Sequence, residues 1–254
     1  MTYAQVSTGF KGGGVNPRPF NLPQARSFAP ETLINYEIGL KSSWFEHKLR
    51  ANLDGFYGKY RDIQETLLSC PQFGGPGPCA LPINAGNANI KGIEFETEAH
   101  PFGGLELDAS LSYIDFEFTR LAPDTGITPG MVPPYTPKKK GSLGVQYAIP
   151  FGPAGSLTPR FDISYQEAIF TSAVNITALD PTGSLNRVPA YALMNLRLTW
   201  KAPKEDWEAA VQVLNLGGKF YYLNKFDLTG AGAGEATAQP GAPREVDFEI
   251  KHRM

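Results

Sequence analysis

Apolar and polar residues alternate along much of this chain, as they do along a β-strand with two unlike faces. The segment near the C-terminus reads Val246-Asp247-Phe248-Glu249-Ile250-Lys251. Between 105 and 113, every odd position is apolar or aromatic and every even position is acidic or serine. The same period of two runs through 92–99, 160–166 and 190–201, and no comparable stretch has a helical period. The pattern predicts antiparallel strands, each with one apolar and one polar face.

Ten strand-like segments recur along the 254 residues, and several of them are 12–17 residues long. They span approximately 2–10, 31–45, 48–66, 87–99, 105–119, 135–149, 156–171, 188–202, 206–222 and 243–253. Strands in globular proteins are usually about 5–6 residues long. A tilted strand that crosses a membrane needs about 9–11 residues. The lengths therefore favour an all-β, antiparallel transmembrane β-barrel over an ordinary soluble sandwich.

The connections alternate between short turns and long loops. Short turns fall at 46–47, 101–104, 151–155 and 203–205, and long loops at 11–30, 67–86, 120–134, 172–187 and 223–242. Outer-membrane barrels show this asymmetry, with short periplasmic turns and longer external loops. Aromatic residues near the strand ends are expected to form two interfacial girdles. These are Trp44, Phe45, Phe151, Trp200 and Trp207 beside the short turns, and Tyr57, Tyr60, Tyr135, Tyr221 and Tyr222 nearer the long loops.

Composition excludes several classes of protein. The 23 Lys and Arg residues against 25 Asp and Glu argue against a nucleic-acid binder, which usually has a basic excess. No apolar run approaches the ~18–20 residues of a membrane-spanning helix, which excludes a helical membrane protein. The run Lys138-Lys139-Lys140 is isolated within a predicted strand. A solvated face or a contact with lipid headgroups therefore explains it better than a nucleic-acid patch.

The cysteines bear on the compartment. The N-terminal residues lack the basic start and apolar core of a signal peptide, so we expect either a cytoplasmic chain or a fragment whose export signal lies upstream. Cys70 and Cys79 lie in a Pro/Gly-rich loop and match no CxxC or zinc spacing. A disulfide there would stabilise the loop by roughly 2–3 kcal/mol and implies an oxidising compartment, which favours the exported fragment. Two unpaired loop thiols are the alternative.

Charge placement distinguishes the two faces of the predicted wall. A Lys or Arg on the lipid face at the bilayer midplane costs about 2–4 kcal/mol. The charged residues of the strands are therefore expected to face a wet lumen, either as cross-strand pairs and solvated charges or as contacts for a lumen plug or a passing solute. They are Glu94, Glu96, Glu98, Glu106, Asp108, Arg160, Asp162, Arg197, Lys201, Asp247, Glu249 and Lys251.

Catalytic chemistry finds little support. The three histidines, His47, His100 and His252, fall at short turns or near the C-terminus, away from the long-loop end where an enzyme acting on external substrates would need them. The chain has no GxSxG, HExxH or Walker pattern. We therefore expect no enzyme, and we assign no catalytic, cofactor-binding or metal-binding residue.

Several short stretches occur together in a characteristic order. They include Asn35-Tyr36-Glu37-Ile38-Gly39-Leu40-Lys41, Tyr60-Arg61-Asp62-Ile63, Ile90-Lys91-Gly92-Ile93-Glu94-Phe95, Tyr135-Thr136-Pro137, Val188-Pro189-Ala190-Tyr191, Val213-Leu214-Asn215-Leu216 and Pro243-Arg244. Taken in this order and at this spacing, they resemble the C-terminal barrel half of a TonB-dependent outer-membrane receptor. The resemblance extends over nearly the whole chain.

The resemblance implies a large barrel of about 22 strands that is filled by an N-terminal plug domain. It also implies TonB-energised import of a scarce ligand, such as a siderophore, cobalamin or an oligosaccharide, across the bacterial outer membrane. On this interpretation residues 1–254 form one partial barrel domain without the plug. The expected partners are outer-membrane lipid, the missing plug and strands, the TonB system and a small-molecule ligand.

Two alternatives remain open from the residues. Ten strands could close alone into a narrow outer-membrane barrel that acts as a pore, an adhesin or a protease. A soluble β-sandwich binding module is the other alternative. It would have shorter strands, and it would stay monomeric and folded without detergent.

Overall fold

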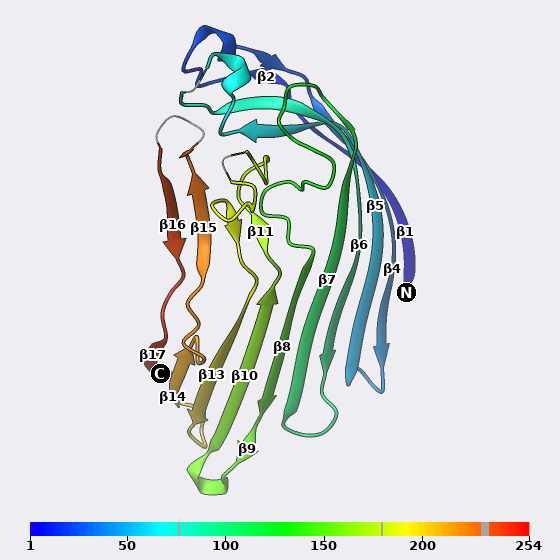
Figure 1. Ribbon diagram of the computed structural model, residues 1–254. Helices are drawn as coiled ribbons and strands as arrows, with labels where there is room; N and C mark the ends of the chain where they lie inside the picture. The colour runs from blue at the N-terminus through cyan, green and yellow to red at the C-terminus, as the bar shows by residue number, and fades with distance from the viewer. Residues whose placement is uncertain (76, 179, 230–233, 254) are drawn as a thin grey trace.

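A single curved antiparallel sheet dominates the computed structural model, which describes residues 1–75, 77–178, 180–229 and 234–253 (Figure 1). Ten strands follow one another in the order β1-β4-β5-β6-β7-β8-β10-β13-β14-β17, and each pairs antiparallel with the next. The predicted all-β fold is confirmed. The sheet is open, because β1 and β17 are its two edges and do not pair with each other within the described part of the chain.

The strands differ in length by more than twofold. Their bounds are β1 (Thr2–Lys11), β4 (Glu31–Trp44), β5 (Leu49–Leu67), β6 (Leu81–Ala99), β7 (Leu105–Leu121), β8 (Lys139–Tyr147), β10 (Ser156–Gln166), β13 (Tyr191–Lys201), β14 (Trp207–Leu214) and β17 (Glu245–His252). The short β9 (Ile149–Pro150) pairs only with β10. At 19 residues each, β5 and β6 extend well beyond the ~9–11 residues that cross a bilayer.

The short turns and the long loops lie at opposite ends of the sheet (Figure 1). The long loops carry three small two-stranded sheets and two 3-10 turns. These are β2 (Gly14–Val15) with β3 (Ser27–Phe28), β11 (Ile169–Phe170) with β12 (Arg187–Val188), β15 (Tyr222–Asp227) with β16 (Ala236–Pro240), η1 (Leu22–Gln24) and η2 (Pro71–Phe73). A third 3-10 turn, η3 (Gly152–Ala154), belongs to a short turn.

Three predicted strand boundaries are wrong by five residues or more, and each has a physical reason. β10 ends at Gln166 rather than at 171 because Ile169 and Phe170 pair with β12 instead of continuing the main sheet. β6 begins six residues earlier than predicted because Leu81 continues the ladder by pairing with Leu67. β14 ends at Leu214 rather than at 222 because Asn215 turns the chain with a φ of 49°. The Asn215 side chain secures this turn: its Oδ1 accepts from the Lys219 amide at 2.8 Å and its Nδ2 donates to the Lys219 carbonyl at 2.9 Å.

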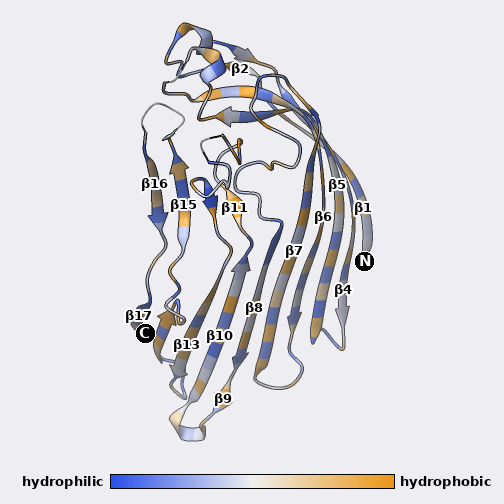
Figure 2. Cartoon of the chain, viewed as in Figure 1, coloured by the Kyte–Doolittle hydropathy of each residue, from blue (hydrophilic) through white to orange (hydrophobic). Residues whose placement is uncertain are grey.

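The two faces of the sheet differ in polarity, and Figure 2 shows hydrophobic and hydrophilic residues alternating along the long strands. Residues paired across an antiparallel ladder lie on the same face. The register of five neighbouring pairs therefore aligns one apolar row across the sheet. Its members are Leu40, Leu53, Phe95, Leu111, Gly141 and Tyr165. We call this side the apolar face, and many of its side chains are exposed, with Phe248 at 81%.

No helix in the described ranges is long and apolar enough to span a membrane.

The buried core lies at the long-loop end rather than under the middle of the sheet. One cluster joins β5, β6 and β7 to the loops that follow β7 and β11, and we call it the loop cluster. Its buried members are Ile63, Ala85, Ala88, Phe118, Ile127, Met131 and Ala173. A second buried cluster surrounds the hairpin end of β5 and β6. Its members are Leu67, Cys70, Cys79 and Leu81.

Candidate functional site: the polar face and the loop cluster

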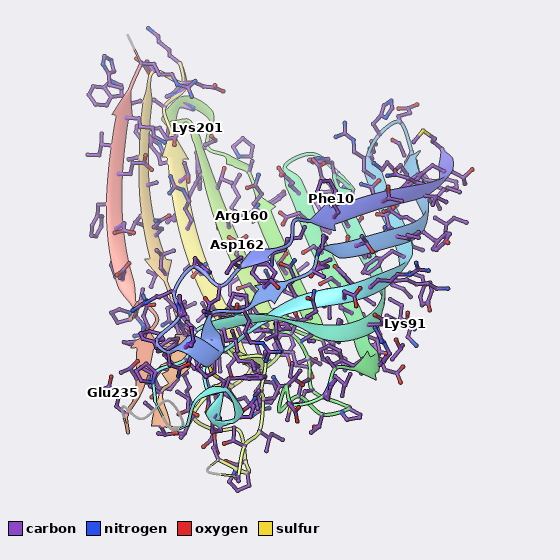
Figure 3. The ribbon with its side chains drawn as sticks, turned by 90° about the horizontal axis from the view of Figure 1, so that it is seen from above. Phe10, Lys91, Arg160, Asp162, Lys201 and Glu235 are labelled. Carbon is purple, nitrogen blue, oxygen red and sulfur yellow. A yellow bond between two sulfur atoms is a disulfide. The ribbon has the colours of Figure 1, made fainter. Side chains whose placement is uncertain are left out.

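All twelve charged residues singled out from the sequence lie on one face of the sheet, which we call the polar face. One row of paired residues shows how the strand register places charged side chains on the same face. It runs through Glu106, Gln146, Arg160, Arg197, Gln212 and Asp247 on consecutive strands from β7 to β17. Viewed from above, Arg160 and Asp162 lie on the concave side of the sheet (Figure 3). Sequence alternation therefore brings these side chains together.

Arg160 on β10 joins three strands of the polar face. Its Nη2 donates to Asp162 at 2.7 Å on its own strand and to Asp108 at 2.9 Å on β7. β8 lies between β7 and β10, and there Gly144 pairs with both carboxylate residues. A Cβ at Gly144 would collide with the Arg160 guanidinium and the Asp108 carboxylate. The missing side chain therefore leaves the space through which this ion pair crosses a strand.

Arg197 forms a second cluster on the polar face near the C-terminal edge. Its Nη2 donates to Glu249 at 2.8 Å and its Nη1 donates to Gln212 at 2.9 Å. Glu249 also pairs with Lys251 at 2.8 Å, and Lys251 lies 3.7 Å from Glu208. The last three strands of the sheet are thereby linked by charge as well as by their backbone ladders.

Two carboxylates without ion pairs lie on the polar face, between the ion-pair clusters of Arg160 and Arg197 and the long loops. Glu94 and Glu96 on β6 form no ion pair in the ranges that the structure describes, whereas Glu98 pairs with Arg50 at 3.6 Å. A groove of about 460 Å³ lies in front of them. Its polar lining is Glu94, Glu96, Ser110, Ser112, Lys140, Ser142, Ser164, Gln166 and Tyr191. The groove offers hydroxyl groups and carboxylates to a polar partner.

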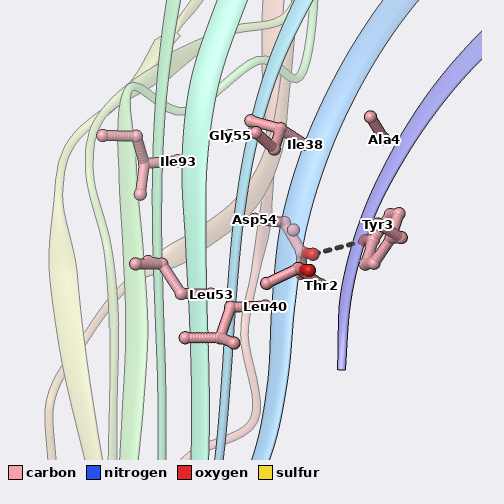
Figure 4. A pocket seen from close by; sticks show the side chains of 10 residues that line it. Thr2, Tyr3, Ala4, Ile38, Leu40, Leu53, Asp54, Gly55 and Ile93 are labelled. Carbon is pink, nitrogen blue, oxygen red and sulfur yellow. Dashed lines mark hydrogen bonds between the residues drawn. The ribbon is translucent and has the colours of Figure 1, made fainter.

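Tyr3 on β1 makes a cross-strand contact that alternation alone did not reveal. Its hydroxyl bonds to Asp54 on β5 (Figure 4) and, at 2.8 Å, to Glu37 on β4. Gly39 on β4 lies between Tyr3 and Asp54 in the register, and a Cβ there would collide with both. These residues border a cavity of about 610 Å³ whose other lining is largely apolar. The only trace of this contact in the sequence is Gly39, and its role can be recognised only once the pairing of β1, β4 and β5 is known.

Above these charged rows the polar face becomes apolar, and the long loops fold back onto it. Phe116 and Phe118 lie in edge-to-face contact, with ring centroids 4.9 Å apart, and Tyr60 packs with them against the loop cluster. The prediction that Tyr60 belongs to an interfacial girdle is therefore wrong. Tyr60 packs under the loops, whereas Tyr57, an odd position on β5, lies on the apolar face with Leu53.

A disulfide lies at the end of the β5–β6 hairpin. Cys70 and Cys79 are joined by an S–S bond of 2.04 Å, and both residues are buried beside Leu67 and Leu81. Phe73 packs against the same cluster, and the Arg26 guanidinium lies 4.6 Å from the centre of its ring. The covalent link therefore ties this loop to an apolar cluster and, through Arg26, to the first long loop.

Buried asparagines hold the remaining loops together. Asn175 accepts from the Val132 amide at 2.7 Å and donates to the Val132 carbonyl at 3.0 Å, joining two long loops. Asn186 donates to Ser172 at 2.7 Å and to the Val174 carbonyl at 2.8 Å. Side chains that replace backbone partners in this way order a loop without regular secondary structure. The sequence had not predicted that either asparagine holds the loops together.

Glu65 is a buried carboxyl group on the loop-side extension of β5. It lies beyond the irregular pairing at Tyr60–Ile63 and only 8% of it is exposed. Burial, reinforced by Glu31 and opposed by Lys11, raises the pKa of Glu65 to about 7. Its charge therefore changes near neutral pH, at the base of the long loops.

The histidines lie near the short turns or the C-terminus. His47 bonds to Ser43 at 2.8 Å, His100 to Glu98 at 3.0 Å, and His252 stacks on Trp207 with centroids 4.3 Å apart. Among the described residues, no group of three or more His, Cys, Asp or Glu side chains is arranged to hold a metal ion.

Comparison with known proteins identifies related sequences. The sequence model of a family described as "TonB dependent receptor-like, beta-barrel" matches residues 1–216. The pesticin receptor of Yersinia pestis is 28% identical over 229 residues, which cover 87% of this chain and 30% of that protein. The ferric-pyoverdine M114 receptor PbuA of a Pseudomonas species is 25% identical over 191 residues, covering 74% of this chain and 21% of that protein.

Solved structures share the fold. The ferric yersiniabactin uptake receptor FyuA of Yersinia pestis superimposes with a TM-score of 0.76 at 23% identity, covering 98% of this chain and 34% of that one. The ferripyoverdine receptor of the Pseudomonas aeruginosa outer membrane gives a TM-score of 0.68 at 19% identity, covering 98% of this chain and 30% of that one. The chain thus spans about a third or less of the length of these relatives.

Proposed function

Because this chain belongs to the TonB-dependent receptor-like β-barrel family, we propose that it forms part of the wall and external loops of an outer-membrane transporter for a ferric siderophore. The observation that carries the proposal is the match to this family over residues 1–216, most of a long-stranded antiparallel sheet. The relatives named above are receptors for pesticin, ferric pyoverdine and ferric yersiniabactin, which supports an iron chelate as the ligand class.

The two faces suit a wall between lipid and a wet lumen. On this proposal the apolar face meets lipid, where a midplane Lys or Arg would cost about 2–4 kcal/mol. The polar face, with Arg160 and Arg197 in its ion-pair clusters, meets the lumen. The groove beside Glu94 and Glu96 would then face a plug domain or the passing ligand.

The open edges of the sheet require further strands. The edges β1 and β17 carry backbone groups that face away from their single neighbours. In lipid each unsatisfied backbone group costs several kcal/mol, so a membrane wall must close. We propose that more strands, a plug domain and a TonB-contacting segment complete the transporter, as they do in the family.

Iron uptake tests the proposed function. The gene is expressed in its native context in a strain that lacks other ferric-siderophore receptors, and uptake of radiolabelled iron is measured with a panel of ferric siderophores. We expect uptake of at least one chelate, loss of that uptake when TonB is deleted, and recovery of the protein in the outer-membrane fraction. Absence from the outer membrane, or TonB-independent uptake of every chelate, would contradict the proposal.

A further inference from the structure

A buried carboxyl group lies where the long loops meet the sheet. Glu65 on β5 is only 8% exposed, and within the described part of the chain its side chain forms no hydrogen bond or ion pair. It pairs in register with Ile83 on β6. Its neighbours on the same face of β5 are Ile63, which belongs to the loop cluster, and Leu67, which belongs to the second buried cluster. The carboxyl group of Glu65 therefore lies between two apolar clusters.

The surroundings of Glu65 join four of the long loops. The Gln64 side chain donates to the carbonyl oxygens of Gly12 and Ala29, each at 3.0 Å, and so holds both ends of the first long loop. Met131, in the loop after β7, is buried in the loop cluster. Val174, in the loop after β11, packs against both buried clusters, and the second of these contains the disulfide of the β5–β6 loop. A movement of this part of β5 therefore disturbs all four loops.

Two charged side chains act on Glu65 from the neighbouring strands. Glu31 on β4 accepts a hydrogen bond from the Gln64 amide at 2.6 Å, so its carboxylate is held one residue away from Glu65. Lys11 at the end of β1 acts in the opposite sense. Burial is the largest influence, and together with Glu31 it outweighs Lys11 and raises the pKa of Glu65 to about 7.

The other elements packed around Glu65 supply no compensating charge. The facing part of β6, residues 81–89, has no titratable side chain. In the loops, Arg18 and Arg26 lie over phenylalanine rings, Asp124 is exposed to solvent, and Asp180 accepts hydrogen bonds within its own loop. An ionised carboxylate that is buried without a partner is so unfavourable that the group takes up a proton instead.

We propose that Glu65 is a proton switch that keeps the long loops closed while its carboxyl group is neutral and releases them when it ionises. The closed arrangement is the one in the structure, where Glu65 holds a proton because its ionised form would lie between apolar side chains. Opening brings the carboxylate into water, and the proton passes to the solvent. The inference concerns the loops of this chain and does not depend on the ligand put forward as the proposed function.

The difference between the closed and open pKa values sets the size of the effect. The pKa of Glu65 is about 7 in the closed arrangement and has its ordinary value of 4.5 when the carboxyl group is exposed. Closure is therefore most favourable below the lower value and is lost as pH rises through the upper one. The open population should increase roughly 70-fold from pH 5 to pH 8 and level off above that.

Oxidation of Met131 by hydrogen peroxide measures this opening. Met131 is 7% exposed inside the loop cluster, whereas Met1 is 76% exposed and acts as an internal reference. A thioether does not titrate, so the ratio of the two oxidation rates follows the open population when the loops reclose quickly. The native protein, purified in detergent, is oxidised at pH 5 to 8 and analysed by peptide mass spectrometry. We expect the ratio of Met131 to Met1 oxidation to rise on the order of 70-fold, and to stay at its pH 5 level in Glu65→Gln.

Three further variants test the electrostatic part of the argument. Glu31→Gln removes a charge that opposes ionisation and should move the midpoint of the oxidation profile to lower pH. Lys11→Gln removes a charge that favours ionisation and should move the midpoint to higher pH. Glu117 is the matched control, because it is exposed and adjoins Phe118 of the loop cluster but lies on the opposite face of β7. Glu117→Gln should leave the profile unchanged.

Several outcomes would overturn the proposal. A pH-independent oxidation ratio in the native protein would do so, as would a pH dependence that persists in Glu65→Gln or disappears in Glu117→Gln. Should Glu65→Gln fail to fold, Glu31→Gln and Lys11→Gln decide the question, and shifts in the same direction, or no shift, would count against the switch. Because the measurement needs no siderophore, it can succeed or fail independently of the iron-uptake experiment.

Discussion

The disulfide between Cys70 and Cys79 makes a quantitative prediction about the end of the longest hairpin. The β5–β6 ladder ends at the pair Leu67–Leu81, and both of these residues are 0% exposed. The cysteines are separated by nine positions, so the bond closes a loop of about ten residues. Chain entropy for a loop of that size corresponds to about 2.7 kcal/mol at 25 °C. Replacing both cysteines by serine should therefore raise the open population of the loop on the order of 100-fold.

Chymotrypsin cleavage after Phe73 measures this opening. Phe73 packs against the cluster of Leu67 and Leu81, so cleavage requires the loop to open. The cleavage rate follows the open population when the loop recloses faster than the protease acts. We expect cleavage after Phe73 to accelerate on the order of 100-fold in the double serine variant.

Exposed phenylalanines in two short turns act as internal controls. Phe102 and Phe151 lie far from the disulfide and are 59% and 50% exposed. Their cleavage rates should not change. An increase at Phe73 of less than about threefold would refute the entropy argument, because apolar packing would then be sufficient to hold the loop closed. An equal increase at Phe102 would show global unfolding instead.

Three further predictions concern single contacts. Gly144→Val and Arg160→Met should each lower the free energy of unfolding of the vesicle-inserted protein, measured in urea, by about 1–2 kcal/mol. The double variant should lose no more than either single variant, because both changes remove the same ion pair. Additive losses would contradict a shared ion pair. Glu65→Gln should stabilise the loops by up to ~3 kcal/mol above pH 7 and leave them unchanged below about pH 4. The folded pKa of about 7 exceeds the unfolded value, so the native protein loses stability as pH rises through this window; a pH-independent effect in hydrogen exchange would refute this. Tyr3→Phe should speed amide exchange along β1. Unchanged exchange would show that the hydrogen bonds of Tyr3 to Asp54 and Glu37 contribute nothing to the stability of this edge strand.

Alternation along the chain was sufficient to predict an antiparallel sheet and the residues that share a face. A period of two assigns each residue to a face whatever its neighbours are. Arg160 and Arg197 could therefore be grouped before their partners were known. Their particular carboxylates, Asp108 and Glu249, could not, because such pairs depend on the register between strands.

The loops were much less predictable. Tyr60 was assigned to an aromatic girdle, yet it packs under the loop cluster with Phe118. Nothing local distinguishes a tyrosine at a membrane interface from one that a distant loop covers. The same limit applies to Asn175, whose contacts lie 43 positions away at Val132. Long-range side-chain contacts of this kind are set by tertiary packing and leave no local period.

The two glycines that lie beneath cross-strand contacts affect how precisely the strands can align. A slip of one residue exchanges the two faces of a strand and is opposed by every apolar side chain. A slip of two residues keeps each side chain on its own face, so alternation gives no protection against it. Moving β8 by two residues would take Gly144 away from the space between Arg160 and Asp108 and put a side chain there instead. A slip of β4 by two residues would likewise take Gly39 away from the space between Tyr3 and Asp54. These two contacts therefore select the correct alignment from a set of alternatives that hydrophobicity cannot distinguish.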